Sequence, residues 1–322
     1  MTKPRIGLLG TGPWAGRTHA PALAAHPGIA FSGVWGRRPE AAAALAAAHG
    51  TRAYDDVDAL LAASDAVAFA LPPDVQAPLA ARAAAAGCHL LLDKPVATSV
   101  AAAREVAEAA GKAGVASVVF CTLRFAADTA PWIEEQAALG GWYLAQAHWL
   151  GALFPPGPAG ASAGVSTGAS ASAYAASPWR REKGGLWDVG PHVLSVLLPV
   201  LGDVTGVSAS VTGAGDTRHL VLGHASGAGS TVTLSLSAPA KAANAGIALF
   251  GDHGRAVMPS WADAVGSFGA AVDGLLGAVR SGRAHPCDVR FGLRVTEILA
   301  EAEAEAEAEA QAEAQAEARL AD

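Results

Sequence analysis

The sequence feature that most constrains the fold is the glycine turn GTGPWAG, which begins at Gly10, the last residue of the apolar run RIGLLG. Gly10 permits a tight turn, Gly12 lets the backbone approach a pyrophosphate, and a small Ala15 lets the next helix pack on the strand. Thr11 and Trp14 lie in the same turn and are candidate cofactor contacts, although Trp14 packing over the turn is an alternative. A strand, this turn and a helix together predict a dinucleotide-binding unit; a purely structural glycine turn is the competing interpretation.

Apolar runs alternate with alanine-rich helical stretches along the first 120 residues. The expected strands are residues 5–10, 29–36, 66–72, 89–95 and 115–120. Continuous apolar strands separated by helices indicate a parallel sheet covered on both faces. We predict the α/β class, with a doubly wound Rossmann domain (1–121), an α+β domain with a large, mainly antiparallel sheet (122–300) and a Glu/Ala-rich tail that is helical or disordered (301–322).

The end of the second expected strand bears on cofactor choice. A NAD-preferring protein usually has an acid there that binds the ribose 2′-hydroxyl, whereas this chain has Gly36 followed by Arg37 and Arg38. Guanidinium groups bind a 2′-phosphate in a bidentate manner. The sequence therefore favours NADP(H), with NAD(H) possible; a solvated arginine pair that opens the next helix is the alternative.

A third motif, LLLDKPVAT, ends the fourth expected strand with Asp93, Lys94 and Pro95. With GTGPWAGRTH before it and DVGPH after it, the chain resembles the Gfo/Idh/MocA oxidoreductases. That family pairs the Rossmann turn with Glu-Lys-Pro and with an Asp-x-Gly-x-His or Asp-x-Gly-x-x-x-His segment in a second domain. The resemblance extends over most of residues 4–298 and includes the block PWRREKGGLWDVGPHVL.

Some positions depart from the family pattern. Asp93 replaces the usual Glu, and Gln76 stands where many members have His, which puts one cofactor contact in doubt. Leu71 and Pro72, at the end of the third expected strand, are further candidate cofactor contacts, together with Asp93 and Gln76. Because Pro191 has no backbone N–H, we expect a helix to begin near it.

The resemblance implies roles for the polar residues. His192 is the expected general acid/base, Lys94 the group that orients and polarises the reacting oxygen, and Asp188 an anchor for a substrate hydroxyl. Lys94 also contacts the cofactor in this hypothesis. Trp179 and Arg180 line the substrate pocket or brace it. The alternatives are an exposed strand-end lysine, a histidine satisfied within the core, and an aspartate that caps a helix.

Charge is unevenly distributed. The tail 301–322 holds seven Glu, one Asp and one Arg, which accounts for the whole net charge of −7. A neutral body without Lys/Arg clusters argues against a nucleic-acid partner. Because Glu and Ala alternate, we expect the tail to be a solvated, fraying extension of the last helix; an interaction segment is the alternative.

Several further expectations follow from composition. No apolar stretch reaches the length of a membrane helix, because Gly, Pro, Asp or Arg interrupts each candidate, and no signal peptide is evident. We therefore expect a cytoplasmic protein without a membrane partner. The cysteines, which are Cys88, Cys121 and Cys287, fit neither a disulfide framework nor a metal site, so we expect reduced, buried thiols and no metal. His19 is expected to pack or to support the site from behind.

The function indicated is NAD(P)-dependent hydride transfer to or from a sugar, cyclitol or sugar-like polyol or ketone. A non-sugar diol or bilin-like substrate and a non-catalytic dinucleotide sensor are the alternatives. The family resemblance also implies a homodimer or homotetramer formed through the C-terminal sheet. The Gly-, Ala-, Ser- and Pro-rich segment 155–178 is either a substrate lid or disordered.

Overall fold

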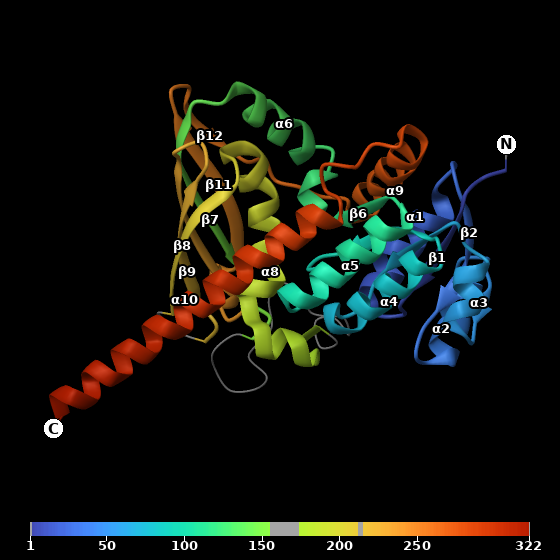
Figure 1. Ribbon diagram of the computed structural model, residues 1–322, viewed down its shortest axis with the longest axis horizontal. Helices are drawn as coiled ribbons and strands as arrows, with labels where there is room; N and C mark the ends of the chain where they lie inside the picture. The colour runs from blue at the N-terminus through green and yellow to red at the C-terminus, as the bar shows by residue number, and fades with distance from the viewer. Residues whose placement is uncertain (1, 155–173, 212–214, 322) are drawn as a thin grey trace. The chain divides into compact units, whose positions relative to one another are not determined.

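The computed structural model describes residues 2–154, 174–211 and 215–321 (Figure 1). Most of the segment for which a substrate lid was predicted therefore lies outside the described residues. The lid hypothesis remains a prediction.

The chain divides into two compact units. They comprise residues 1–127 with 261–296, and residues 128–260 with 297–322. The first unit thus includes residues 261–296, which we expected in the second domain. The physical reason is apolar burial, since helix α9 (Ala264–Ser281) buries Phe268 and Leu275 in the same cluster as Leu23. Local sequence carries no signal for such a return.

The first unit contains a six-stranded sheet in the order β3-β2-β1-β4-β5-β6. The strands are β1 (Arg5–Leu9), β2 (Ala30–Trp35), β3 (Ala53–Tyr54), β4 (Ala66–Phe69), β5 (His89–Asp93) and β6 (Ser117–Phe120). All neighbouring strands are parallel, so the predicted doubly wound Rossmann domain is confirmed. The two-residue β3 is too short to give a periodic signal and was not predicted.

Helices cover both faces of this sheet. They are η1 (Ala15–His19), α1 (Ala20–Ala25), α2 (Pro39–Ala48), α3 (Val57–Ala62), α4 (Pro73–Ala85), α5 (Val100–Ala113), η2 (Thr122–Arg124) and α9. One apolar cluster packs α1, α2 and α9 against Ile6 and Leu8 of β1. A second cluster packs α3, α4 and α5 against Leu9 and Phe69. The two layers hold the carboxyl ends of the strands, where the glycine turn begins.

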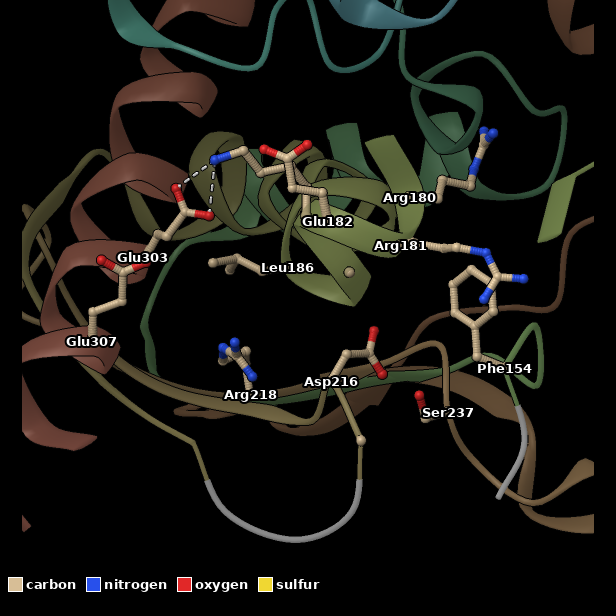
Figure 2. Close-up of a pocket in the computed structure, with 13 residues that line it drawn as sticks. Phe154, Arg180, Arg181, Glu182, Leu186, Asp216, Arg218, Ser237, Glu303 and Glu307 are labelled. Atoms are coloured by element: carbon tan, nitrogen blue, oxygen red, sulfur yellow. Dashed lines mark hydrogen bonds and ion pairs between the residues drawn. The ribbon is translucent and has the colours of Figure 1, made fainter. Parts of the chain in front are cut away.

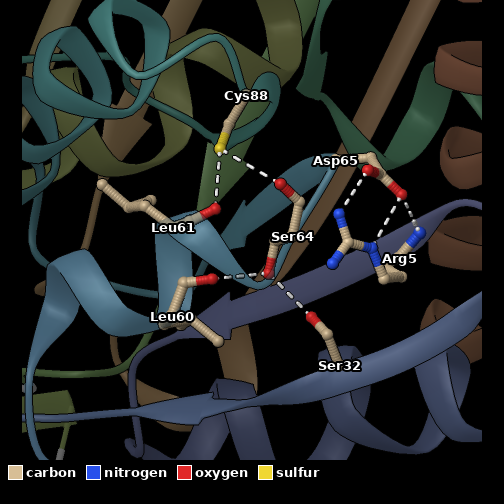
Figure 3. Close-up of polar contacts among 7 residues, drawn as sticks. All are labelled: Arg5, Ser32, Leu60, Leu61, Ser64, Asp65 and Cys88. Carbon is tan, nitrogen blue, oxygen red and sulfur yellow. Dashed lines mark hydrogen bonds and ion pairs between the residues drawn. The ribbon is translucent and has the colours of Figure 1, made fainter.

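A polar network ties the start of β1 to the loop before β4 (Figure 3). The Arg5 backbone N–H donates to Asp65 Oδ2 at 2.7 Å, and Arg5 Nη2 donates to Asp65 Oδ1 at 2.8 Å. This guanidinium holds the pKa of Asp65 below its usual value. Nearby, the Ser32 and Ser64 hydroxyls are 2.7 Å apart, and Cys88 Sγ donates to the Ser64 carbonyl at 3.5 Å. These contacts lie toward the amino-terminal ends of the strands, away from the glycine turn.

The second unit contains a mixed sheet in the order β12-β11-β7-β10-β9-β8. Its elements are α6 (Thr129–Leu139), β7 (Trp142–Leu150), α8 (Pro178–Leu201), β8 (Val204–Ser210), β9 (Arg218–His224), β10 (Gly229–Ser235), η3 (Ala240–Ala242), β11 (Asn244–Gly251) and β12 (Gly254–Val257). Among the described strands of this second sheet, β7 and β10 form the one parallel pair, and the other neighbouring pairs are antiparallel. The predicted, mainly antiparallel sheet is therefore confirmed.

Helix α8 lies on one face of this sheet, where it packs against β7 and β10. Its length and hydropathy would suffice to cross a membrane, contrary to our expectation that no segment reaches that threshold. However, 83% of its most apolar 18-residue window is buried within the protein. The apolar character of α8 is thus explained by its position in the core.

The last helix, α10 (Val289–Ala321), runs through the Glu/Ala tail. Residues up to 296 belong to the first unit and the remainder to the second. Ala302 and Ala306 are buried, while most of the helix beyond them is exposed. The tail is therefore helical, which is one of the two predicted states. Its first turns are partly buried, whereas we expected the whole tail to be solvated.

Candidate active site

The two glycines of the first turn have different surroundings. Gly10 has φ of 127°, and a Cβ there would collide with the Ala70 carbonyl. At Gly12, nothing among the described residues lies within 4 Å of a built Cβ, so the backbone is open to a ligand. Ala15 is fully buried at the start of η1. These are the properties that close approach of a pyrophosphate requires.

Trp14 and His19 flank the first helical turn. The Trp14 side chain is half-buried against the apolar cluster beneath it, and its ring lies edge-on to His19 with centroids 6.1 Å apart. His19 is fully buried and tilted against Phe268 at 4.1 Å. Burial lowers the pKa of His19 to about 3, so the imidazole is neutral at working pH. His19 therefore packs behind the turn, as expected.

A steric contact explains why a glycine follows β2. A Cβ at Gly36 would lie 2.5 Å from Thr11 Cγ2 of the first turn. An acid at this position is incompatible with the present Thr11 rotamer. Arg37 and Arg38 follow it with exposed side chains, and Arg38 is the N-cap residue of α2. Both guanidiniums are accessible to a charged ligand.

Gln76 holds the segment that carries Lys94. Its Nε2 donates to the carbonyls of Asp93 at 2.9 Å, Pro95 at 3.2 Å and Val96 at 3.1 Å, and its Oε1 accepts from the Asp93 N–H at 2.9 Å. The whole side chain is buried. Gln76 is therefore engaged with the backbone on both sides of Lys94, a bracing role that the sequence did not reveal.

Lys94 follows directly after β5, at the carboxyl edge of the parallel sheet. Its backbone N–H donates to Asp93 Oδ1 at 2.8 Å, and its side chain is half-buried. Leu71 and Pro72 are also half-buried, at the end of the neighbouring β4. All these residues belong to the first unit, at the edge where open α/β sheets bind ligands.

The second unit gathers four of the predicted residues around α8. Asp188 and His192 are one turn apart and buried. Arg180 Nε donates to Asp188 Oδ2 at 3.1 Å, and the guanidinium lies 4.5 Å from the centre of the Trp179 ring. The His192 ring stacks on Trp149 of β7 at 4.6 Å, with 15° between the planes. A buried acid and a buried imidazole thus lie one turn apart on α8, and a partly exposed guanidinium is paired with the acid.

The prediction that a helix begins near Pro191 is wrong. Helix α8 is broken at Gly184, where φ is 61° and ψ is −158°, and the helical backbone resumes with Gly185. Pro191 lies inside this second segment. The Gly185 N–H donates to Asp216 Oδ2 at 2.5 Å, so a carboxylate caps the segment from outside the helix. The alternative of Asp188 as a cap is also excluded, because Asp188 lies within the helix.

Asp216 is a structural residue that the sequence analysis missed. Its carboxylate also accepts the Leu236 N–H, with both oxygens at 3.0 Å, and the Ser235 hydroxyl at 3.0 Å. A Cβ on Gly185 would lie 2.8–2.9 Å from the Ser235 backbone. Asp216 and Gly185 thus lock α8 onto β10. The only local signal was an acid in the turn-forming stretch GAGDTR.

A cavity of about 420 Å³ lies beside the break in α8 (Figure 2). Arg181 and Phe154 lie on one side of it, and Glu303 and Glu307 of α10 lie on the other. Its remaining lining residues are Arg180, Glu182, Lys183, Gly184, Leu186, Gly215, Asp216, Arg218 and Ser237. The lining is strongly polar, with both signs of charge.

The three cysteines are free and buried, as expected. Burial raises the pKa of Cys121 and raises that of Cys287 to about 11. Among the residues that the structure describes, no three His, Cys, Asp or Glu side chains gather as metal ligands would. The predicted catalytic residues belong to different units, Lys94 to the first and Asp188 and His192 to the second.

Comparison with known proteins gives matches along the chain. The family model described as "Oxidoreductase family, NAD-binding Rossmann fold" (Gfo/Idh/MocA) matches residues 4–120. The UDP-N-acetylglucosamine 3-dehydrogenase of Acidithiobacillus ferrooxidans is 41% identical over 95 residues, which are 30% of this chain and 29% of that protein. The D-glucoside 3-dehydrogenase of Escherichia coli is 30% identical over 205 residues, which are 62% of this chain and 54% of that protein. The aligned regions thus span only about a third to a half of these curated relatives.

Solved structures share the whole fold. That of the Acidithiobacillus ferrooxidans UDP-N-acetylglucosamine 3-dehydrogenase superposes with a TM-score of 0.78 at 21% identity, covering 96% of this chain and 99% of that one. The WlbA dehydrogenase of Bordetella pertussis, in complex with NADH and UDP-GlcNAcA, gives 0.77 at 23% identity, covering 95% and 97%. At these identities the likeness establishes the fold alone.

Proposed function

We propose that the chain is an NAD(P)-dependent dehydrogenase or reductase, because its residues 4–120 match the Gfo/Idh/MocA oxidoreductase family with its NAD-binding Rossmann fold. The proposed substrate is a secondary hydroxyl, or the matching ketone, on a sugar, cyclitol or sugar-like metabolite. The names of the relatives, a UDP-N-acetylglucosamine 3-dehydrogenase and a D-glucoside 3-dehydrogenase, support this substrate class.

The observation that carries the proposal is the buried cluster on α8. His192 is held flat against Trp149, and Asp188 is paired with Arg180 one helical turn away. A binding module would have no need of an imidazole and a paired carboxylate in a buried position, where each costs desolvation energy. The cluster therefore favours catalysis over a sensor.

The chain's residues have distinct proposed roles in alcohol oxidation. His192 removes the hydroxyl proton as hydride leaves the same carbon, and it returns the proton in the reverse direction. Lys94 donates to the reacting oxygen and stabilises its developing negative charge. Asp188 accepts a hydrogen bond from a neighbouring substrate hydroxyl. When bound, the nicotinamide takes up or supplies the hydride.

We further propose NADP(H) as the preferred cofactor, with NAD(H) as the alternative. Two accessible guanidiniums, Arg37 and Arg38, follow a position where a side chain would meet Thr11. Arg37→Ala should therefore raise the KM for NADP by about tenfold while the KM for NAD changes little. Equal use of both cofactors by the unmodified protein would contradict the preference.

A homodimer or homotetramer formed through the second sheet, and a cytoplasmic location, are also proposed. The sheet face opposite α8 exposes Val221 and Val257, whose exposed fractions are 59% and 48%. Exposed apolar side chains on this sheet face support the oligomer. Sedimentation of the purified protein tests it, and a monomer at micromolar concentration would count against it.

The decisive test is turnover of a panel of sugars, nucleotide sugars and cyclitols with NAD and NADP in parallel. Lys94→Ala and His192→Asn should each lower kcat at least a hundredfold, and in His192→Asn the dissociation constant for NADPH should stay within about threefold. Lys112→Ala, at an exposed position in α5, is the matched control. If the protein binds NADPH but turns over none of the panel, the sensor interpretation replaces the enzyme.

A further inference from the structure

Helix α8 has two segments that meet at Gly184. Arg180 belongs to the first segment, and Asp188 and His192 belong to the second. The Arg180–Asp188 pair therefore depends on the angle between the segments. Asp216 anchors the second segment through the Gly185 N–H. A further contact is needed to fix the first segment relative to the second.

Glu303 makes that contact from helix α10. Its carboxylate accepts Lys183 Nζ at 3.1 Å on Oε1 and at 3.0 Å on Oε2, and it accepts Trp187 Nε1 at 3.0 Å on Oε1. Lys183 immediately precedes the break, and Trp187 follows it by three residues. One carboxylate thus bonds both segments of α8.

The surroundings make this contact specific. Trp187 is 1% exposed, so its indole N–H needs an acceptor inside the protein. The Lys183 and Glu303 side chains are only 21% and 29% exposed, and the Lys183 ammonium also lies 5.1 Å from the Trp187 ring centre. On α10 the buried Ala302 and Ala306 hold this turn of the helix in place. Glu305, two residues further on, is exposed and offers a matched control.

We propose that Glu303 is a positioning residue that joins the two segments of α8 and thereby holds Arg180 on Asp188 for substrate binding. The role in substrate binding rests on the proposed function; the bridge across Gly184 does not. Glu303→Ala removes both contacts, whereas Glu303→Gln keeps an acceptor for Trp187 and loses only the charge opposite Lys183. The effects should therefore be graded, with the alanine variant the more severe.

Two measurements on the full chain test the proposal. In Glu303→Ala, amide hydrogen exchange of residues 178–188 should become at least fivefold faster than in Glu305→Ala. With the best substrate of the panel, KM should rise about five- to tenfold in Glu303→Ala and less in Glu303→Gln, while the NADPH dissociation constant stays unchanged. The KM of Lys183→Met should match that of Glu303→Gln. The double variant that carries both substitutions should have a KM no higher than either single variant.

The outcomes separate the possible explanations. If Glu303→Ala exchanges like Glu305→Ala, the bridge does not hold the helix and the proposal fails. If exchange accelerates but KM is unchanged, Glu303 is only a structural brace and its positioning role fails. If the unmodified protein turns over no substrate, the proposed function fails, and the exchange measurement still decides whether the bridge exists.

Discussion

Arg180 and Asp188 are eight residues apart in one helix, yet Arg180 Nε donates to Asp188 Oδ2 at 3.1 Å. In an unbroken α-helix this spacing would separate the two backbones by about 12 Å along the axis. The break at Gly184 removes this constraint. A backbone irregularity thus builds the polar part of the candidate site.

We expect this pair to control substrate affinity more than cofactor affinity. Arg180→Ala leaves the largely buried Asp188 carboxylate without this partner and should lower kcat/KM by about 30- to 100-fold, at a stability cost of about 1–3 kcal/mol. Arg180→Lys keeps the charge but not the Nε geometry, and it should lower kcat/KM by about tenfold. Steady-state kinetics with NADPH titration measure both effects. Arg181→Lys, at the exposed next position, should behave as the unmodified protein.

Gln76 should affect Lys94 through the backbone. Gln76→Leu fills a similar volume but leaves the Asp93 N–H and the carbonyls of Asp93, Pro95 and Val96 without this partner. We expect a loss of about 2–4 kcal/mol of unfolding free energy and a fall in kcat that exceeds the change in NADPH affinity. Urea unfolding and single-turnover kinetics measure them. Unchanged kcat in a folded Gln76→Leu protein would show that Lys94 needs no such brace.

Cofactor choice should depend on Thr11 as well as on the arginines. Gly36→Asp alone introduces a Cβ 2.5 Å from Thr11 Cγ2 and should weaken binding of both NAD and NADP about tenfold. Thr11→Ala removes that methyl group. The double variant should therefore bind NAD more tightly than Gly36→Asp does, a non-additive result that a double-mutant cycle of dissociation constants detects. Additive effects would exclude the steric explanation.

Close packing of α8 on β10 gives a stability test. Gly185→Ala places a methyl group 2.8–2.9 Å from the Ser235 backbone and should cost about 1–3 kcal/mol. Gly269→Ala, within α9 where no described atom lies within 4 Å of a built Cβ, should instead stabilise by up to about 1 kcal/mol. Chemical denaturation distinguishes the two signs. Equal effects would mean that the Gly185 contact relaxes without cost.

Local patterns predicted most of the first unit. The glycine turn, the apolar strands and the Asp93–Lys94 strand end are contiguous signals, because each depends on residues close in sequence. The residues missed are those whose roles depend on distant partners: Asp216 reaches Gly185, Gln76 brackets Lys94, and Glu303 bridges α8. Glu303 lies in an alternating Glu/Ala stretch, so its sequence context predicts a solvated side chain. Only the structure shows that it accepts a hydrogen bond from the buried Trp187 indole.

The pH dependence of stability should carry the signature of His19. Burial lowers its pKa from 6.5 to about 3, so between these values the unfolded chain binds a proton that the folded protein does not. Unfolding free energy therefore falls as the pH drops below 6.5, and this residue alone should contribute about 2 kcal/mol of loss between pH 7 and pH 5.

Urea titrations at the two pH values measure the difference within each variant. His19→Phe should reduce that difference by the stated amount, even if it shifts stability at both pH values, because each variant is compared with itself. His253→Gln, at an exposed position, should leave the difference unchanged. A His19→Phe protein that loses as much stability as the unmodified chain would mean that His19 takes up its proton before unfolding, and that the turn behind the cofactor site opens locally at pH 5.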